Sequence, residues 1–205
     1  PHRTKDPIVI AAQLVTSLQT IVSRTVSPFD PAVVTVGSIR GGTKHNIIPD
    51  FVDLQLTVRT YRPEVRSLVL DSIRRIAAAT AEAAGLSGEL APRVEVSEDE
   101  HTPATYNNPE LTQRLTQALK AELGEPKVVE VDPVMAGEDF AQYSLEGHTI
   151  PSCIFWLGAV SQEQYEREQD QLPPLHSSSF APDPEPAIGT GVRAMTAAAL
   201  DLLGE

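Results

Sequence analysis

The sequence predicts an α/β (α+β) fold in two parts, because three patterns along the chain indicate mixed helices and strands. Between residues 32 and 60, apolar and polar residues alternate with the period of two that is typical of β-strands. Segments with apolar residues three and four positions apart flank this region and predict helices. After residue 108, short apolar runs alternate with helical segments, as in α/β domains. The 205 residues are enough for one large or two small domains.

The first half of the chain begins with a helix and two strands. Asp6 and Pro7 form the N-cap and first-turn pair of the helix, and Pro28 lies just past its end. A Val-rich strand follows at 32–40. The second strand, at 52–59, has the clearest alternation in the chain, so we expect it to have one buried face and one polar face.

A second helix and a third strand complete this part. The helix begins at Pro63 and ends at Gly85, and a short strand is expected at about 93–98. The order helix, strand, strand, helix, strand is that of a β-α-β-β-α-β ferredoxin-like unit without its first strand. We therefore expect an exposed sheet edge, which sequence upstream of Pro1 would cover.

The second half reads as the last part of an α/β domain. Residues 99–108 are polar and are expected to form a linker, after which a helix begins at Asn108 and Pro109 and ends near Gly124. The elements expected next are a strand at 127–131, a turn or helix within 135–143, a strand at 152–157, an exposed loop at 162–171 and a closing helix at about 186–203.

Charge and cysteine content limit the partners and the cellular location. The formal net charge is −12 and Lys and Arg form no cluster, so we expect no binding to nucleic acid or to anionic membranes. No apolar run approaches the roughly 20 residues that span a bilayer. The single Cys153 lies in an apolar run and cannot form an internal disulfide, which favours a buried thiol and a cytoplasmic location.

Histidine is the residue type that best indicates a metal or catalytic site here, although none of the five histidines lies in a local metal-binding motif. His176 is the best candidate, because it sits between Leu-Pro-Pro-Leu and a run of serines, in a loop from which an imidazole can point into a cleft. The histidines expected at the solvated surface are His45, His101 and His148.

Four other residues are candidates on residue type. Glu138 and Asp139 follow Gly137, which is equally compatible with a helix-capping sequence and with the edge of a polar pocket. Asn46 lies between the two strands, where an ordinary turn asparagine is the simpler interpretation. Arg59 lies on the polar face of the second strand, where a solvated charge is the simpler interpretation.

A series of short motifs follows in order along the chain: Pro1-His-Arg-Thr-Lys-Asp-Pro-Ile, Gly41-Gly-Thr, Asn46-Ile-Ile-Pro-Asp, Thr57-Val-Arg-Thr, Met135-Ala-Gly-Glu-Asp-Phe and Leu175-His-Ser. This series resembles the aminoacylase/carboxypeptidase family of metallopeptidases. Within the family, it is most similar to the branch of hippurate hydrolases and indoleacetyl-amino-acid hydrolases. The resemblance covers essentially the whole chain.

The resemblance implies a domain organisation and a set of partners. Members of this family have a zinc-peptidase-like α/β catalytic domain that is interrupted by a ferredoxin-like lid, and the lid usually also dimerises. Residues 1–102 would then be an incomplete lid/dimerisation domain and residues 103–205 the C-terminal part of the catalytic domain. The intact enzyme would bind two divalent metal ions (zinc, manganese or similar), of which this chain holds at most a partial site, and would form a homodimer through the lid.

The resemblance also implies a role for each candidate residue. His176 corresponds to the fifth metal ligand, whereas the other four ligands and the glutamate general base precede the lid and are not in this chain. Asn46 matches a lid asparagine that helps to stabilise the oxyanion in the partner's site, and Arg59 matches the arginine that binds the substrate carboxylate. Residues 137–139 would line the substrate pocket.

The expected activity is hydrolysis of N-acyl or aryl-acyl amino acids to a carboxylic acid and an amino acid, and this chain alone is expected to be inactive. Two alternatives stay open. The chain could be a non-catalytic dimerisation or binding module of the same family, or it could have a carboxypeptidase or dipeptidase specificity on the same fold.

Overall fold

The computed structural model describes residues 2–97, 99–144 and 150–204, and the contacts within it divide the chain into two compact units. Unit 1 contains the residues up to Thr105 together with Val134–Asp139. Unit 2 contains Tyr106–Pro133 and the residues from Phe140 onward. The short segment Val134–Asp139 therefore belongs to unit 1, although the chain on both sides of it belongs to unit 2.

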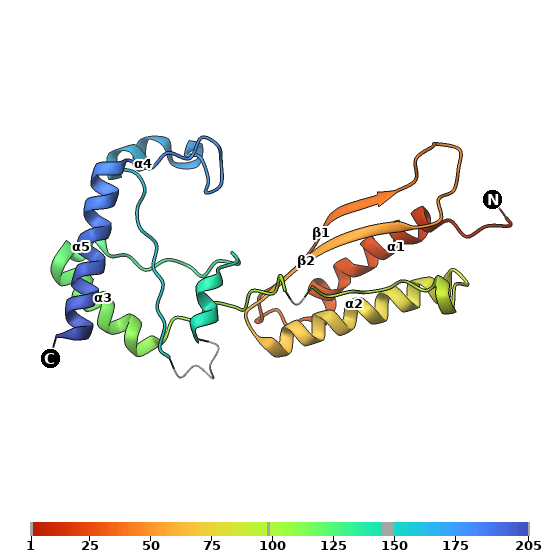
Figure 1. Cartoon of the computed structure of the whole chain (residues 1–205), viewed down its shortest axis with the longest axis horizontal. Coiled ribbons are helices and arrows are strands. Elements are labelled where there is room, and N and C mark those ends of the chain that lie inside the picture. Colours follow the sequence, from red (N-terminus) through yellow and green to blue (C-terminus); the bar gives the residue numbers. More distant parts are fainter. Residues whose placement is uncertain (1, 98, 145–149, 205) are drawn as a thin grey trace. The chain divides into compact units, whose positions relative to one another are not determined.

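Unit 1 is a two-stranded antiparallel sheet with two helices on one face (Figure 1). Its elements are α1 (Pro7–Thr20), the π-helical turn η1 (Ile21–Thr25), β1 (Ala32–Gly41), β2 (Val52–Thr60), α2 (Pro63–Ala83) and the 3-10 turn η2 (Gly88–Leu90). The two helices and the first two strands predicted from the sequence are confirmed, and each strand is one residue longer than expected.

The start of α1 follows from its first residues. A side-chain oxygen of Asp6 accepts a hydrogen bond from the backbone N–H of Ile8 at 2.9 Å, which satisfies one of the donors that a helix N-terminus leaves without an intrahelical partner. Pro7 fills the first helical position, where its missing N–H is not needed.

The core of unit 1 lies between the helices and the sheet. Leu18, Ile21 and Val69 are its most deeply buried large side chains, at 1% exposed or less. In β2, the apolar residues are half-buried whereas the alternating polar residues are exposed, so the predicted polar face is confirmed. The sheet thus presents its second face, on which Arg59 lies, outside this core.

The segment Pro7–Thr25 is long and apolar enough to cross a membrane by length and composition, with a mean hydropathy of 1.2. The expectation that no apolar run approaches that length is therefore wrong. Polar residues such as Gln13 and Thr16 interrupt the run, but the mean hydropathy of the whole segment stays high. Leu18 and Ile21 from this segment pack in the core of unit 1, although only 17% of the apolar stretch is buried.

The third strand expected at about 93–98 is wrong for the residues that the structure describes, since 93–97 pair with neither β1 nor β2. Val94 nevertheless packs against the core. A strand needs a neighbouring backbone to bind its N–H and C=O groups, and neither strand of the sheet provides one. Alternating apolar residues therefore predicted the packing of this segment but not its hydrogen bonding.

A β-bulge in β1 keeps its apolar residues in register with those of β2, although Ile39, beyond the bulge, is 51% exposed. Val36 pairs with Leu56 and Ser38 pairs with Gln55, so Gly37 is an extra residue without a partner in β2. The shift brings Ile39 opposite Leu54, on the side of the sheet that the helices cover.

Gly41, at the end of β1, allows α1 to approach the sheet closely. A Cβ atom at this position would lie 2.6 Å from Cγ2 of Val52 and 2.9 Å from Cδ1 of Ile8. Gly41→Val is therefore expected to lower the free energy of unfolding of unit 1 by about 1–3 kcal/mol, the usual cost of overpacking. Urea unfolding would measure the change. Gly37→Ala is the matched control, because its Cβ would meet no atom closer than 4.0 Å, and an equal loss in both variants would contradict the steric explanation.

Unit 2 is built on two packed helices, α3 (Pro109–Leu123) and α5 (Pro184–Leu203), with small helices between them. Leu115, Leu119, Ala194 and Ala198 are buried in these helices. Nε of Arg114 lies 2.6 Å from Oδ2 of Asp201, and a second pair joins Arg193 and Glu122 at 2.8 Å. The predicted helix that begins after Asn108 is confirmed, and the closing helix begins two residues earlier than expected.

Two strands expected in this half, at 127–131 and 152–157, are wrong in the structure, which describes no strand there. Both segments expose apolar side chains, including Val129 (73% exposed) and Trp156 (59% exposed). The second segment is held instead by the side-chain amide of Asn107, which accepts from the N–H of Ile154 at 2.9 Å and donates to its carbonyl at 2.8 Å. These segments lack a strand partner among the described residues, so their β-forming sequence does not produce a sheet.

The loop expected at 162–171 is also wrong, because it contains α4 (Gln162–Glu168) and a 3-10 turn, η5 (Gln169–Gln171). The hydroxyl of Ser161 caps this helix by accepting from the N–H of Gln164 at 3.2 Å. The side chains of Gln164 and Arg167 donate hydrogen bonds to the carboxylate of Glu168 and lower its pKa. Side-chain pairs four residues apart therefore stabilise a helix in a segment whose charge suggested a loop.

Candidate functional site

Arg59 and the segment Val134–Asp139 come together in unit 1. Nη1 of Arg59 donates a hydrogen bond to the backbone carbonyl of Met135, across 76 positions of sequence. Arg59 is exposed on the polar face of β2, and Met135 is half-buried. The bond therefore brings Arg59 to Met135, which precedes Gly137, Glu138 and Asp139 by two to four positions in the same segment.

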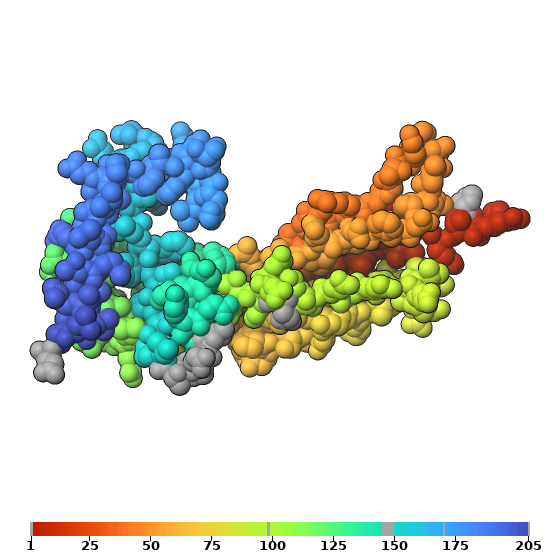
Figure 2. Space-filling model, viewed as in Figure 1, coloured from red at the N-terminus to blue at the C-terminus, as the bar shows by residue number. Residues whose placement is uncertain are grey.

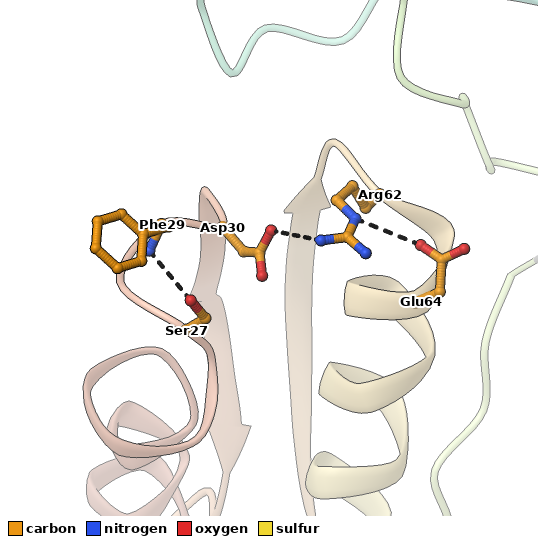
Figure 3. Close-up of polar contacts among 5 residues, drawn as sticks. All are labelled: Ser27, Phe29, Asp30, Arg62 and Glu64. Carbon is orange, nitrogen blue, oxygen red and sulfur yellow. Dashed lines mark hydrogen bonds and ion pairs between the residues drawn. The ribbon is translucent and has the colours of Figure 1, made fainter.

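Near the end of the sheet that carries Arg59, one ion pair joins the loop before β1 to the start of α2, and a second lies within the start of α2. Nη1 of Arg62 lies 3.0 Å from Oδ1 of Asp30, and Nε of Arg62 lies 3.6 Å from Oε2 of Glu64 (Figure 3). In the same loop the N–H of Phe29 donates to the hydroxyl of Ser27 at 3.3 Å. Exposed pairs of this kind contribute little energy each.

Asn46 lies at the opposite end of the hairpin from Arg59. It is exposed in the loop between β1 and β2, in a turn where the N–H of Ile47 donates to the carbonyl of Lys44 at 3.4 Å. The loop projects beyond the packed body of unit 1 (Figure 2). Arg59 lies seven positions beyond Val52 in β2, which corresponds to about 23 Å at about 3.3 Å per residue. One small substrate therefore cannot contact Asn46 and Arg59 of the same chain.

His176 lies in unit 2, in the loop between η5 and α5. Its φ of 67° is in the left-handed region, and the N–H of Ser177 donates to the carbonyl of Pro174 at 3.1 Å, which closes a tight turn around it. The imidazole is exposed. Residues other than glycine adopt this conformation uncommonly, and such positions are concentrated at functional sites.

The potential ligands in this chain do not by themselves form a metal centre. Among residues 2–97, 99–144 and 150–204, no three His, Cys, Asp or Glu side chains cluster closely enough to hold a metal ion. His176 is exposed in its turn, and its role as a metal ligand stays a prediction. The surface interpretation of His45 and His101 agrees with their exposure, whereas His148 lies outside the described residues.

Hollows in the two units do not coincide with the candidate residues. A hollow of about 410 Å³ lies between the start of α1 and the end of α2 and is lined by residues such as Lys5, Asp6 and Ala83. A cavity of about 20 Å³ in unit 2, beside Asn108 and Ser152, has room for one water molecule at most. Sequence reasoning quoted Met135 only as part of a motif and did not expect its contact with Arg59, because that contact uses a backbone carbonyl. It did not single out Asn107, whose side-chain amide binds the backbone of Ile154.

Comparisons with known proteins agree on one family. The model of peptidase family M20/M25/M40 matches residues 5–201. Two thermostable carboxypeptidases of Saccharolobus solfataricus are each 34% identical over 183 residues, which is 89% of this chain and 42% of theirs. The N-acetyldiaminopimelate deacetylase of Bacillus pumilus is 36% identical over 201 residues, which is 96% of this chain and 47% of that protein.

A solved structure has the same fold. The YxeP protein of Bacillus subtilis, described as a dinuclear metal binding peptidase from the M20 family, aligns with a TM-score of 0.66 and 24% identity. The alignment covers 98% of this chain and 46% of the YxeP chain. This chain thus spans less than half the length of these relatives.

Proposed function

Because this chain belongs to peptidase family M20/M25/M40, we propose that it is part of a metal-dependent amidohydrolase that cleaves N-acyl or aryl-acyl amino acids. The observation that carries the proposal is the occurrence of the candidate residues, in order, within a match of residues 5–201 to this family. Relatives named thermostable carboxypeptidase and N-acetyldiaminopimelate deacetylase support the proposal, because both names denote hydrolysis of an amide bond. The hippurate hydrolase type, in which the acyl group is aromatic, belongs to this proposal.

Arg59 is proposed to bind the carboxylate of the substrate. A guanidinium presents paired donors in one plane, which matches a carboxylate better than the point charge of a lysine does. Its bond to Met135 uses Nη1, so a carboxylate can be bound through Nε and Nη2 at the same time. The turn at Gly137, Glu138 and Asp139 is proposed to line the pocket beside it.

His176 is proposed as one ligand of a two-metal centre, with the other ligands and the general base supplied by sequence outside this chain. The residues that the structure describes do not fit a two-metal centre on their own, so no reaction step is assigned to a metal within this chain. Asn46 is proposed to donate a hydrogen bond to the oxyanion in the site of a second subunit, because it is too far from Arg59 to share a substrate with it.

Unit 1 is proposed to be a ferredoxin-like lid/dimerisation domain without its first strand, and unit 2 the C-terminal part of a zinc-peptidase-like catalytic domain. The helix–strand–strand–helix order and the packing of Val94 support the first assignment. In the β-α-β-β-α-β topology the first strand lies between the third and the fourth. The unpaired segment 93–97 is then explained, since its neighbour would be the strand that is missing.

The proposal is tested by comparing this chain alone with a chimera that contains it. The 205-residue chain, assayed with zinc or manganese on N-acetyl and N-benzoyl amino acids, is expected to show no hydrolysis above background. A chimera in which it replaces the matched region of the Bacillus pumilus deacetylase is expected to hydrolyse these substrates and to lose activity with a chelator. Metal-stimulated hydrolysis by the chain alone would contradict the expected inactivity, and a folded but inactive chimera would contradict the assigned function.

A homodimer formed through unit 1 and a cytoplasmic location complete the proposal. The alternative of a non-catalytic dimerisation module predicts the same self-association without turnover in any chimera. Sedimentation of the 205-residue chain at several concentrations would show whether it associates.

A further inference from the structure

The segment Val134–Asp139 leaves unit 2, contacts unit 1 and returns, and little packing holds its middle part in place. Ala136 and Gly137 are exposed, and a Cβ atom added to Gly137 would meet no other atom within 4 Å. Met135 and Glu138, on either side, are half-buried. The conformation of this turn must therefore be set mainly at its two ends.

The end at Met135 is held by the side chain of Arg59, whose backbone is paired within the sheet. Arg59 extends from a paired position of β2, opposite Val33, and donates to the Met135 carbonyl through Nη1. A charged donor makes a stronger hydrogen bond to a carbonyl than a neutral donor does. The acceptor is a backbone group, so the bond fixes the path of the main chain rather than one rotamer.

We propose that Arg59 is a positioning residue that orders the Met135–Gly137 part of this segment and so places the turn containing Glu138 and Asp139 beside the guanidinium. Residues 138 and 139 are three and four positions beyond Met135, and each residue extends the chain by at most about 3.6 Å. The two carboxylate-bearing residues therefore have backbones within roughly 15 Å of the Met135 carbonyl that Arg59 holds.

This inference extends the proposed function but does not depend on it for its test. If Arg59 also binds the substrate carboxylate, one guanidinium sets both the position of the substrate and the position of the turn that lines its pocket. The ordering itself requires neither substrate nor metal. It can therefore be measured in the 205-residue chain, and its failure would leave the proposed hydrolysis untouched.

The test is a measurement of backbone order by ¹⁵N relaxation in the wild-type chain and in Arg59→Met, which keeps the apolar stem but removes the donors. The order parameters of Ala136 and Gly137 are expected to fall from about 0.85 to below about 0.6. Arg59→Lys keeps one charged donor and is expected to restore part of the order. Arg40→Met is the matched control, because Arg40 lies on the same face of the sheet, paired with Asp53. This variant is expected to leave the order parameters of Ala136 and Gly137 unchanged.

Unchanged order parameters at Ala136 and Gly137 in Arg59→Met, with the β1–β2 signals intact, would overturn the proposal, as would an equal fall in Arg40→Met. If Arg59→Met does not fold, Arg59→Thr is measured in its place, because threonine favours strands and its hydroxyl is too short to reach Met135. Cleavage after Glu138 by a glutamate-specific protease is a second measurement, and it is expected to be several-fold faster in either variant than in the wild-type chain.

Discussion

Replacing His176 by asparagine in the complete enzyme is expected to lower kcat/KM for N-acyl amino acids by at least about 10²-fold, because loss of even an outer partner of a metal ligand costs about 10–100-fold. Asparagine is chosen because it tolerates the left-handed backbone that His176 adopts, with a φ of 67°. The substitution therefore removes the imidazole without changing the turn. Metal content per subunit, measured together with activity, is expected to fall as well.

The control for this experiment is His101→Ala, which removes an exposed histidine that belongs to the linker region rather than to the proposed site. It is expected to keep wild-type activity and metal content. If His176→Asn kept both, His176 would not be a ligand, and its left-handed conformation would be a feature of the turn alone.

A second large effect is expected from mixing defective subunits. Arg59→Met is expected to lower activity by about 10–150-fold, because this is the loss expected when a hydrogen bond to a charged group is removed. Asn46→Ala is expected to lower activity by about 10²–10³-fold, because this is the usual rate loss when one oxyanion donor is removed. Asn46 and Arg59 lie at opposite ends of one hairpin, so we expect each active site to take them from different subunits. A purified heterodimer of the two variants then has one intact site and is expected to recover about half of wild-type activity.

The matched control is a heterodimer of a wild-type subunit with the double variant that carries both substitutions. It contains the same two substitutions, but each of its sites has one defect, so it is expected to stay nearly inactive. Two affinity tags on the subunits allow both heterodimers to be purified. If the Asn46→Ala and Arg59→Met subunits did not complement each other, the two residues would act in one site of one chain, and the length of β2 would have to be bridged by a large rearrangement of the loop.

The parts of the fold that could be predicted from the sequence are those that local interactions determine. The Asp6-Pro7 pair predicted where α1 begins, and the alternation in β2 predicted which side of the strand carries Arg59. The segments 93–97, 127–131 and 152–157 were predicted as strands because their residues favour strands, but a strand forms only when another backbone lies beside it. No local pattern contains that information.

The candidate site was predictable to a similar degree. The resemblance identified Arg59, Asn46 and His176 as residues of interest, and the structure added how they are held. The contact between Arg59 and the carbonyl of Met135 joins residues 76 positions apart through a group that every residue possesses, so no residue type marks it in the sequence. The left-handed backbone of His176 could not be predicted either, because the preceding prolines suggest a turn but do not indicate the sign of φ at His176.

The course of the chain between the two units limits how these units could be exchanged between proteins. The chain passes from one unit to the other after Thr105, again after Pro133 and a third time after Asp139. A gene segment that ended at Thr105 would encode the sheet and its helices but would omit Met135, the acceptor for Arg59. Recombination at that boundary would place Arg59 of this protein opposite a segment from another protein in place of residues 134–139. A segment that ends at Thr105 would therefore not contain all of unit 1, and the surface around Arg59 is expected to change over evolution together with residues 134–139.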